Sequence, residues 1–287
     1  MKTLEGLELQ VAEEVLKKHF PRSYKVYGFL HSINRGKPTI LEVVVDAWPD
    51  FKVIICRPDL ANRHVMDYTL KVTIFSMDEQ IFRMMLENTV DWRHNFLFAG
   101  LDASNEPIIR EVSAMKNINQ KTYTNAAVHL LYLPNISDLN SPTVDGELGL
   151  RITSLDLSHV DLVNNTWKFG GNERAYRNIK RSISNFPTCC IKDELDQPVS
   201  WILVYDYCAI GILYTVPEHR GKGYGKVLVS ALAKRLYAEG YPIYCFIEQD
   251  NTVSYKLFKS LGFTEDSSYR AVWLDVNTPK DLVPKRS

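Results

Sequence analysis

A glycine-rich turn between an apolar segment and an amphipathic segment restricts the fold of this chain more than any other feature. The turn is Arg220-Gly221-Lys222-Gly223-Tyr224-Gly225. The apolar residues 208–216 before it predict a buried strand, and the spacing of apolar residues over 227–236 predicts a helix after it. Glycines let successive backbone N–H groups converge, the helix start adds the positive end of its dipole, and Arg220 and Lys222 add full charges. The turn therefore predicts a cradle for a diphosphate.

The turn matches neither of the two common nucleotide-binding loops. Its spacing lacks the Lys-Ser/Thr pair of a P-loop, and the chain contains no G-x-G-x-x-G motif. An ordinary glycine turn that ends a strand is the simpler alternative. Because strand, turn, cations and helix all agree, we expect the diphosphate site.

Composition excludes several classes of protein. A length of 287 residues corresponds to roughly two domains of ~150 residues. Basic and acidic residues both number 34, so a nucleic-acid partner is not expected. The longest apolar stretches have strand length, far short of the ~20 residues that span a bilayer. Five cysteines form no C-x-x-C pair, so we expect neither a zinc or other metal site nor a disulfide framework, in a reducing intracellular compartment.

The chain divides near residue 140 into two halves of mixed α+β class. Residues 133–149 combine Pro and Gly with Asn, Ser and Asp and show no sustained apolar period, which is typical of a linker. We expect one domain over residues 1–140 and a second over residues 141–287. No repeat is visible residue by residue, but two halves of similar length and content can share one fold.

Apolar periodicity predicts the elements of each half. In the first half we expect helices at residues 4–15, 79–87 and 108–115, and strands at 25–33, 39–46, 51–56, 69–75 and 126–133, of which the first two form a hairpin. In the second half we expect strands at 150–155, 188–192, 199–205, 208–216, 243–248, 263–264 and 270–275, and helices at 159–167, 173–185, 227–236 and 252–261. The order of the second half is β-α-α-β-β-β-α-β-α-β-β, and the first half has no catalytic signature.

The turn and several distant motifs resemble one family. The R-x-x-G-x-G turn after Val-Pro-Glu-His resembles the acyl-CoA pyrophosphate loop of the Gcn5-related N-acetyltransferase superfamily, and the element order from residue 150 to 276 is similar to that fold. Segments along nearly the whole chain resemble the glycine N-acyltransferases, in particular the glycine N-acyltransferase-like branch. They include Lys-Val-Tyr-Gly at 25–28, Asp-Ala-Trp-Pro-Asp-Phe at 46–51, Phe-Gly-Gly-Asn-Glu-Arg at 169–174, Phe-Pro-Thr-Cys-Cys at 186–190 and Tyr-Thr-Val-Pro-Glu-His-Arg at 214–220.

This resemblance implies an activity and its partners. It implies transfer of an acyl group from acyl-CoA to the amino group of glycine or a similar small amino acid, which gives an N-acylglycine and CoA. The first half would be the N-terminal domain of that family and the second half the acyl-CoA-binding domain. CoA would act as cosubstrate, with no tightly bound cofactor, no membrane span and a monomeric chain. The protein would be intracellular, with the mitochondrion as its expected location and the endoplasmic reticulum or the cytosol as alternatives.

The resemblance also implies where CoA binds. In this superfamily two parallel strands splay apart around the pantetheine, and residues 210–216 and 243–248 are the corresponding pair. Backbone N–H groups near residues 213–215 would bind the pantetheine amides and the oxyanion. The expected CoA contacts are Leu213, Tyr214, Thr215, Val216, Arg220, Gly221, Lys222, Gly223, Tyr224, Gly225, Asn251 and Phe258.

Two expected catalytic groups are missing. Glycine N-acyltransferases carry a glutamate six residues before the Thr of Thr-Val-Pro, where this chain has Ala209. Glu248, at the end of the second splayed strand, is then the candidate base and would take the amine proton through one water; a solvated strand-end glutamate is the alternative. A tyrosine that protonates the departing sulfur in this superfamily is replaced by Phe258.

The acceptor's carboxylate requires a cation near the loop before residue 174. Arg174 is the first candidate and Lys168 the second, although a surface arginine on a helix is the commoner case. Because Ala209 and Phe258 replace two catalytic residue types, an acyl-CoA-binding protein without turnover is an alternative function. A protein or peptide amine acetyltransferase is another, since the turn alone would allow it.

Overall fold

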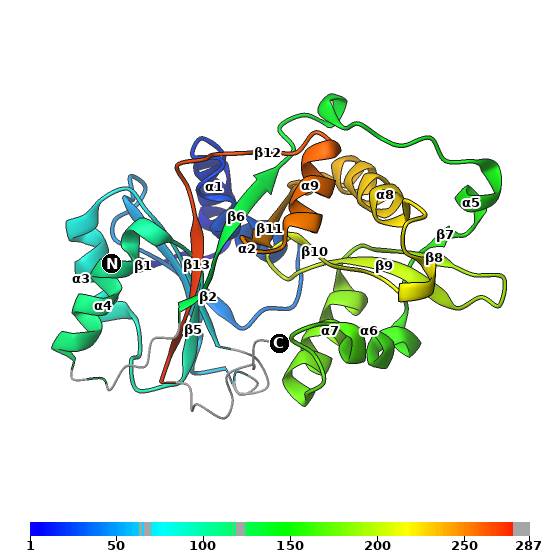
Figure 1. The fold of residues 1–287 in the computed structure, drawn as a ribbon. Helices are drawn as coiled ribbons and strands as arrows, with labels where there is room; N and C mark the ends of the chain where they lie inside the picture. The colour runs from blue at the N-terminus through cyan, green and yellow to red at the C-terminus, as the bar shows by residue number, and fades with distance from the viewer. Residues whose placement is uncertain (63–64, 66–69, 117, 119–123, 278–287) are drawn as a thin grey trace. The chain divides into compact units, whose positions relative to one another are not determined.

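The computed structural model describes residues 1–62, 65, 70–116, 118 and 124–277, with residues 124–126 described in their backbone only (Figure 1). The chain forms two compact units. Unit 1 comprises residues 1–129 and 267–287, and unit 2 comprises residues 130–266. Within the described part of the chain, no helix is long and apolar enough to cross a membrane.

Unit 1 is a mixed sheet with two pairs of helices. Its elements are β1 (Lys2–Thr3), α1 (Leu7–Lys17), α2 (Tyr24–Asn34), β2 (Leu41–Val45), β3 (Val53–Pro58), β4 (Lys71–Ser76), α3 (Glu79–Thr89), β5 (Phe96–Asp102), α4 (Glu106–Met115), the first part of β6 (Thr124–Tyr132), and β13 (Ala271–Val276). The strand order is β1-β2-β3-β4-β5-β13-β6, with β4 and β5 parallel and β13 antiparallel to both of its neighbours. The last strand among the described residues therefore lies inside the sheet of unit 1.

Unit 2 is built on the strand order β6-β11-β10-β9-β8-β7. Its elements are α5 (Gly146–Leu150), β7 (Ile152–Thr153), α6 (Val160–Thr166), α7 (Glu173–Asn185), β8 (Thr188–Lys192), β9 (Pro198–Val204), β10 (Ile210–Thr215), α8 (Tyr224–Ala238), β11 (Tyr244–Glu248), α9 (Thr252–Ser260) and β12 (Thr264–Glu265), which pairs with the end of β6. Helices α6 and α7 cover one face of this sheet, and α8 and α9 cover the other (Figure 1).

The two units repeat one order of elements. Each has a short strand, two helices, an antiparallel three-stranded meander, a helix, a strand parallel to the last strand of the meander, and another helix. The expectation that the two halves share a fold is thus met at the level of topology. The domain boundary expected near residue 140 stays a prediction. The two units do not follow this boundary, because β13 pairs with β5 and the C-terminal residues 267–287 are therefore part of unit 1.

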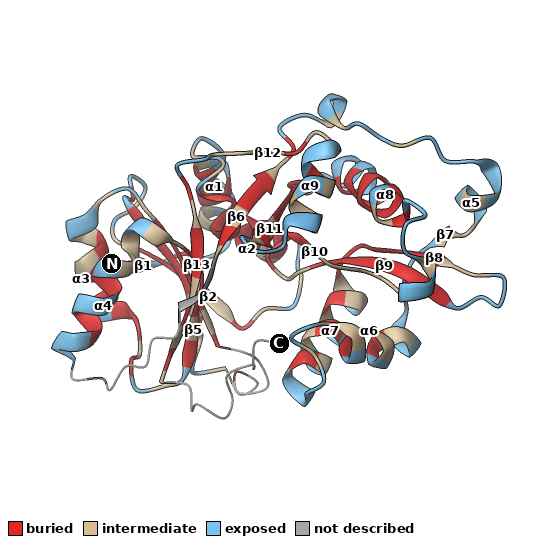
Figure 2. Ribbon diagram, viewed as in Figure 1, coloured by how far each residue is buried: buried red, intermediate tan, exposed pale blue. Residues whose placement is uncertain are grey.

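Each unit has its own apolar core. In unit 1 the core lies between the sheet and helices α3 and α4, with Phe82, Phe98 and Leu274 fully buried. In unit 2 Trp201 of β9 is fully buried against the face that α6 and α7 cover. Figure 2 shows β9 buried along its whole length, because helices cover both of its faces.

Most predicted elements are present, but the strand at residues 25–33 and the hairpin that it was to form with residues 39–46 are wrong. Residues 25–33, predicted as a strand, belong to helix α2. Every residue of α2 from Tyr24 to Ser32 is buried, so the segment has no polar face and its apolar pattern cannot distinguish a helix from a strand. The strand β5 was not predicted, and the strand expected at residues 150–155 is reduced to the two residues of β7.

A buried carboxylate joins helices α1 and α2. The Glu13 side chain accepts hydrogen bonds from His31 Nδ1 and Arg35 Nη1, both at 3.0 Å, and from Asn34 Nδ2 at 2.7 Å. Burial raises the pKa of Glu13, but these donors and the Arg35 charge outweigh it and lower the pKa to about 2. Because the pKa is lower in the folded state than its ordinary value of 4.5, Glu13 stabilises the fold above about pH 4.5.

We expect Glu13→Gln to destabilise the protein at pH 7 by roughly 2–3 kcal/mol, because the neutral amide leaves buried donors and a cation without their carboxylate. The difference from wild type should shrink as the pH falls from about 4.5 towards 2, where Glu13 itself becomes protonated. Urea unfolding across this range measures it. The control Glu14→Gln removes an exposed partner of Lys17 and should change stability by less than ~0.5 kcal/mol. An undiminished difference at low pH would contradict the assignment.

Candidate functional site

Strands β10 and β11 separate soon after they begin. Their parallel pairing has a single register pair, Ile210 with Cys245. Beyond it, β10 remains paired with β9 through Tyr214–Trp201 and Thr215–Ser200. The edge of β10 from Gly211 onwards that would face β11 is therefore open in unit 2, as the predicted splayed pair requires.

A β-bulge turns β10 away from its neighbour. Gly211 pairs with Leu203 and Tyr214 with Trp201, so β10 has one extra residue between these positions. Within the extra stretch Ile212 has a φ of 52°, which is rare for a β-branched residue. The bulge re-aims Leu213 to Thr215, whose backbone is predicted to bind the pantetheine.

The predicted cradle follows β10. Gly221 and Gly223 have φ values of 78° and 79°, in the left-handed region that only glycine adopts without strain, and Gly223 is the N-cap of α8. Within the described residues, no hydrogen bond from a backbone N–H of residues 221–225 to a protein acceptor is found. N–H groups without a protein acceptor at the start of a fifteen-residue helix are the donors that the predicted diphosphate cradle requires.

The third glycine of the turn has a packing role. A β-carbon at Gly225 would lie 3.0 Å from Cδ1 of Leu257 and 3.7 Å from Cδ2 of Leu213. The first turn of α8 therefore lies close to both α9 and β10. Glycine at this position brings the helix N-terminus to the open edge of the strand.

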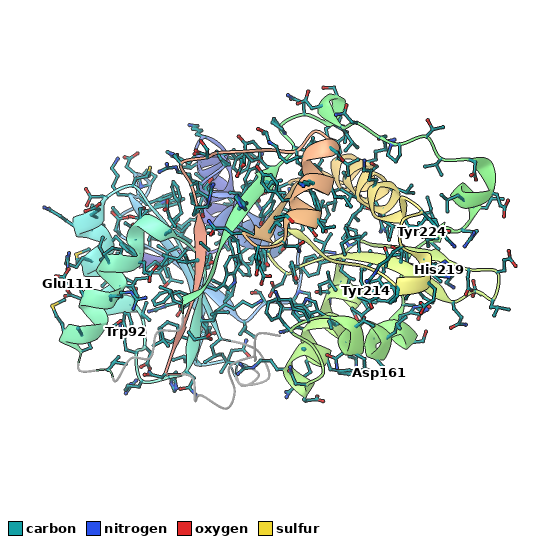
Figure 3. All side chains as sticks on the ribbon, viewed as in Figure 1. Trp92, Glu111, Asp161, Tyr214, His219 and Tyr224 are labelled. Atoms are coloured by element: carbon teal, nitrogen blue, oxygen red, sulfur yellow. The ribbon has the colours of Figure 1, made fainter. Side chains whose placement is uncertain are left out.

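The side chains around the turn are anchored to β10. Arg220 Nε donates to the carbonyl oxygen of Thr215 at 3.0 Å, and its guanidinium lies 5.6 Å from the ring centre of Tyr214. Tyr214 stacks on Trp201, and His219 stacks on Tyr224. Figure 3 labels Tyr214, His219 and Tyr224 in unit 2. Arg220 and the exposed Lys222 thus place two positive charges at the turn.

Two predicted CoA contacts on α9 have structural partners. Asn251 is the N-cap of α9, and its Oδ1 accepts the N–H of Ser254 at 3.1 Å. Phe258 is buried and packs edge-to-face on Phe263, with ring centres 5.0 Å apart. Ala209, where the resemblance implies a glutamate, is also buried.

The structure joins the predicted base to one of the two predicted acceptor cations. Lys168 Nζ forms an ion pair with Glu248 Oε2, which links the loop between α6 and α7 to the end of β11. Arg174 lies exposed at the second position of α7. No local pattern in the chain indicates this pair, because its members are 80 residues apart.

The equivalent place in unit 1 lacks the cradle. Helix α3 follows β4 as α8 follows β10, but its N-cap is Asp78, which accepts the N–H of Ile81, and Glu79 occupies its first turn. The hydroxyl of Thr73 donates to the carbonyl of Ala99 and bridges β4 and β5 just past their last paired residues. Acidic groups at the helix start oppose binding of a diphosphate.

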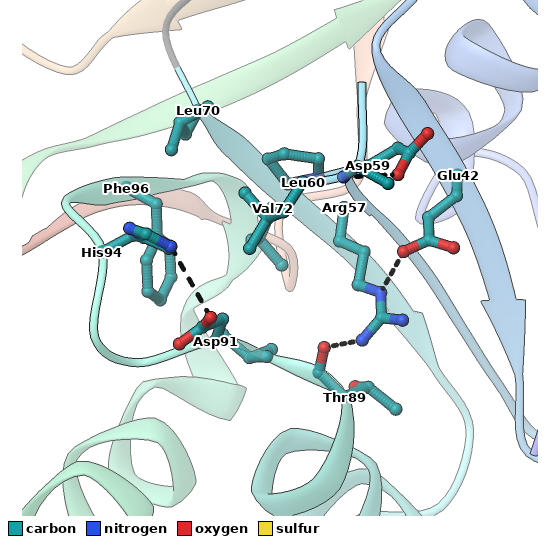
Figure 4. A pocket seen from close by; sticks show the side chains of 13 residues that line it. Glu42, Arg57, Asp59, Leu60, Leu70, Val72, Thr89, Asp91, His94 and Phe96 are labelled. Carbon is teal, nitrogen blue, oxygen red and sulfur yellow. Dashed lines mark hydrogen bonds and ion pairs between the residues drawn. The ribbon is translucent and has the colours of Figure 1, made fainter. Parts of the chain in front are cut away.

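Unit 1 has a pocket of about 330 Å³ elsewhere, at the C-terminal end of α3 (Figure 4). The Arg57 guanidinium in its wall donates to Glu42 Oε1 and to the carbonyl of Thr89. Asp91 binds His94 and Arg93. The charges in this wall therefore have partners within unit 1, and Arg57 serves to cap the end of α3.

Comparisons with known proteins agree with the geometry. The family described as aralkyl acyl-CoA:amino acid N-acyltransferase matches residues 1–187, and FR47-like protein matches residues 190–274. Human glycine N-acyltransferase is 32% identical over 279 residues, which cover 91% of this chain and 94% of that protein.

Solved structures share the fold. An X-ray structure of a Drosophila protein matches with a TM-score of 0.76 at 15% identity, covering 96% of this chain and 97% of that chain. A tandem GNAT protein from the clavulanic acid biosynthesis pathway matches with a TM-score of 0.51 at 12% identity, covering 93% of both chains. The predicted mixed α+β class and Gcn5-related fold are confirmed.

We expect Gly223→Val to weaken CoA binding at least tenfold, because a β-branched residue at this φ shifts the N–H groups of the turn. Isothermal titration calorimetry with CoA measures the effect. Gly240→Val is a matched control, since Gly240 has a φ of 73° and open space around it just past the other end of α8. The control should lose similar stability but keep its CoA affinity. Unchanged affinity in folded Gly223→Val would remove the turn from the site.

Proposed function

The chain belongs to the aralkyl acyl-CoA:amino acid N-acyltransferase family, and from this premise we propose its reaction and the residues that perform it. It is an acyltransferase that moves an acyl group from acyl-CoA to the amino group of glycine or a similar small amino acid, giving an N-acylglycine and CoA. The observation that carries this proposal is an anion-binding turn at the end of a strand with an open edge.

The turn and the open edge of β10 bind different parts of the CoA molecule. The N–H groups of residues 221–225, with Arg220 and Lys222, hold the diphosphate. The backbone of Leu213, Tyr214, Thr215 and Val216 binds the amides of the pantetheine, and Asn251 and Phe258 border it from α9. This assignment is supported by the 3.0 Å contact that a β-carbon at Gly225 would make with α9, since it brings the three elements together.

Acyl transfer requires three further things: a neutral amine at the carbonyl, donors for the developing oxyanion and a route for the proton. Backbone N–H groups along the open edge of β10 supply the donors. Glu248 takes the proton, directly or through one water, and its ion pair with Lys168 holds the carboxylate at the end of β11. The CoA thiolate leaves without a tyrosine at residue 258, which lowers the rate but permits the reaction.

One alternative is supported by a specific observation. Ala209 is buried where relatives of this type carry the base, and Phe258 packs on Phe263, so neither offers an ionisable group. A protein that binds acyl-CoA without turnover would have these features. A monomeric state and a mitochondrial location remain predictions from the family resemblance.

Thiol release from several acyl-CoAs, measured with and without glycine, glutamine and a short peptide, tests the proposal. We expect release that depends on a free small amino acid, together with formation of the N-acylated product. CoA binding without release would establish the alternative. Release that depends on the peptide and not on glycine would indicate a peptide amine acetyltransferase.

We expect Ala209→Glu to raise kcat near neutral pH, because it restores a carboxylate beside the point where β10 and β11 separate. A gain of roughly tenfold or more is of the order that general bases contribute. Ala209→Gln adds similar volume without the charge and should not raise kcat. Steady-state rates of both variants, with circular dichroism as the test of folding, check it. Equal rates for the two variants would contradict a role for a base at this position.

A further inference from the structure

We infer that the Lys168–Glu248 ion pair is the receptor for the acceptor amino acid, which it binds as a zwitterion; this inference rests on the proposed function. A free α-amino acid has an ammonium and a carboxylate on the same carbon atom. The ion pair offers one partner for each, a carboxylate at Glu248 and an ammonium at Lys168. Recognition of such a molecule requires two closely spaced protein groups, each opposite in charge to one of its two charged groups.

The pair lies at the C-terminal end of β11, on the face of that strand that also carries Tyr244 and Phe246. Successive residues of a strand point to opposite faces, so Tyr244, Phe246 and Glu248 share one face of β11. Phe246 on this face contacts the ring of Tyr207, with ring centres 6.3 Å apart. Both Phe246 and Glu248 are half-buried there, while Cys245 and Ile247 on the other face are fully buried.

Tyr205 connects this face to the point where the strands separate. A β-carbon at Gly211 would lie 2.1 Å from Cε2 of Tyr205, so the tyrosine ring lies directly on the first residue past the last β10–β11 pair. Burial, the charge of Asp206 and the charge of Glu248 raise the pKa of Tyr205 well above its ordinary value. Tyr205 also stacks on Tyr207, and Tyr207 contacts Phe246 on the face of β11 that carries Glu248, so this face adjoins the point where the strands separate.

The loop that holds Lys168 is fixed by hydrogen bonds. Gly171 N donates to the carbonyl of the buried Asn164 at 2.9 Å and to its side-chain oxygen at 3.1 Å. A β-carbon at Gly170 would lie 1.9 Å from the same carbonyl, so only glycine fits there. Asn172 then caps α7 through Ala175 N at 2.9 Å. Such a loop presents the lysine in one place, which lowers the entropic cost of binding.

Binding of the acceptor exchanges partners. Its ammonium replaces that of Lys168 at the Glu248 carboxylate, and its carboxylate replaces that of Glu248 at Lys168. One ammonium proton then passes to Glu248, and the neutral nitrogen forms the C–N bond at the thioester carbonyl as the C–S bond breaks. The second proton leaves the nitrogen with the departing thiolate, which becomes the CoA thiol, and Glu248 returns its proton to solvent.

An acceptor without a carboxylate leaves Lys168 unmatched. The wild-type protein should therefore use glycine in preference to glycinamide, with a ratio of kcat/KM of roughly thirtyfold. In Lys168→Met this ratio should fall by about that factor, while CoA affinity measured by calorimetry stays the same. Because the ratio is compared between variants, the different basicities of the two amines cancel.

Two further variants separate the candidates. Arg174→Met tests the competing cation, and Lys180→Met removes an exposed lysine of the same helix as a matched control. Both should keep the wild-type ratio. A ratio that persists in Lys168→Met, or falls in Arg174→Met, would overturn the inference while leaving transfer to glycine intact. Thiol release that needs no amino acid in the wild-type protein would instead remove the proposed function, and this inference with it.

The charge-reversed pair tests whether the contact is only structural. Lys168→Glu combined with Glu248→Lys re-forms an ion pair between the same elements with opposite polarity. If the pair receives a zwitterion near the acyl group, the double variant should bind CoA normally but recover neither turnover nor the preference for glycine, because the amine is then held at residue 168 and no carboxylate stands at residue 248 to take its proton. Recovery of both would show that the pair merely holds the loop in place and would overturn the inference.

Discussion

The early separation of β10 from β11 is the constraint on which the rest of unit 2 depends. Hydrogen bonding between them ends at the Ile210–Cys245 pair, and the bulge at Ile212 prevents it from resuming. An open strand edge inside a sheet leaves donors and acceptors that require partners. A ligand with amide groups supplies them. The cradle at residues 221–225 lies at the end of this edge, so one molecule that has amides at one end and a diphosphate at the other fits both.

The repeated topology shows how a common arrangement is used differently in the two units. Both have a parallel pair of strands with a helix between them, but the helix starts differ. Gly223 exposes the N–H groups of α8, whereas Asp78 occupies those of α3 with its own carboxylate. The gap between the strands also differs, since the Thr73 side chain bridges it in unit 1, whereas the pairing of β10 with β11 in unit 2 ends at Ile210 and Cys245. Unit 1 therefore lacks the two features on which the proposed CoA site of unit 2 depends.

Local patterns predicted much of this structure. The predicted cradle and the order of elements after residue 150 follow from short segments whose glycines, cations and apolar periods agree. The splayed pair was implied by the family resemblance. Helix α2 was mistaken for a strand because it is buried on every side, and the periodicity that identifies helices depends on a polar face. The insertion of β13 beside β5 joins residues about 170 positions apart, which no local pattern reports. The pairing of Lys168 with Glu248 was not predicted for the same reason, since each residue alone resembles an ordinary surface charge.

Amide hydrogen exchange with and without CoA tests the central claim most directly, because it reads the backbone groups to which the ligand is assigned. We predict slower exchange in the presence of CoA at residues 221–225 and along β10 from Leu213 to Thr215. At the start of α3, residues 78–81, exchange should be unchanged. Protection at α3, or an absence of protection at residues 221–225 at saturating CoA, would contradict the assignment of the site to unit 2.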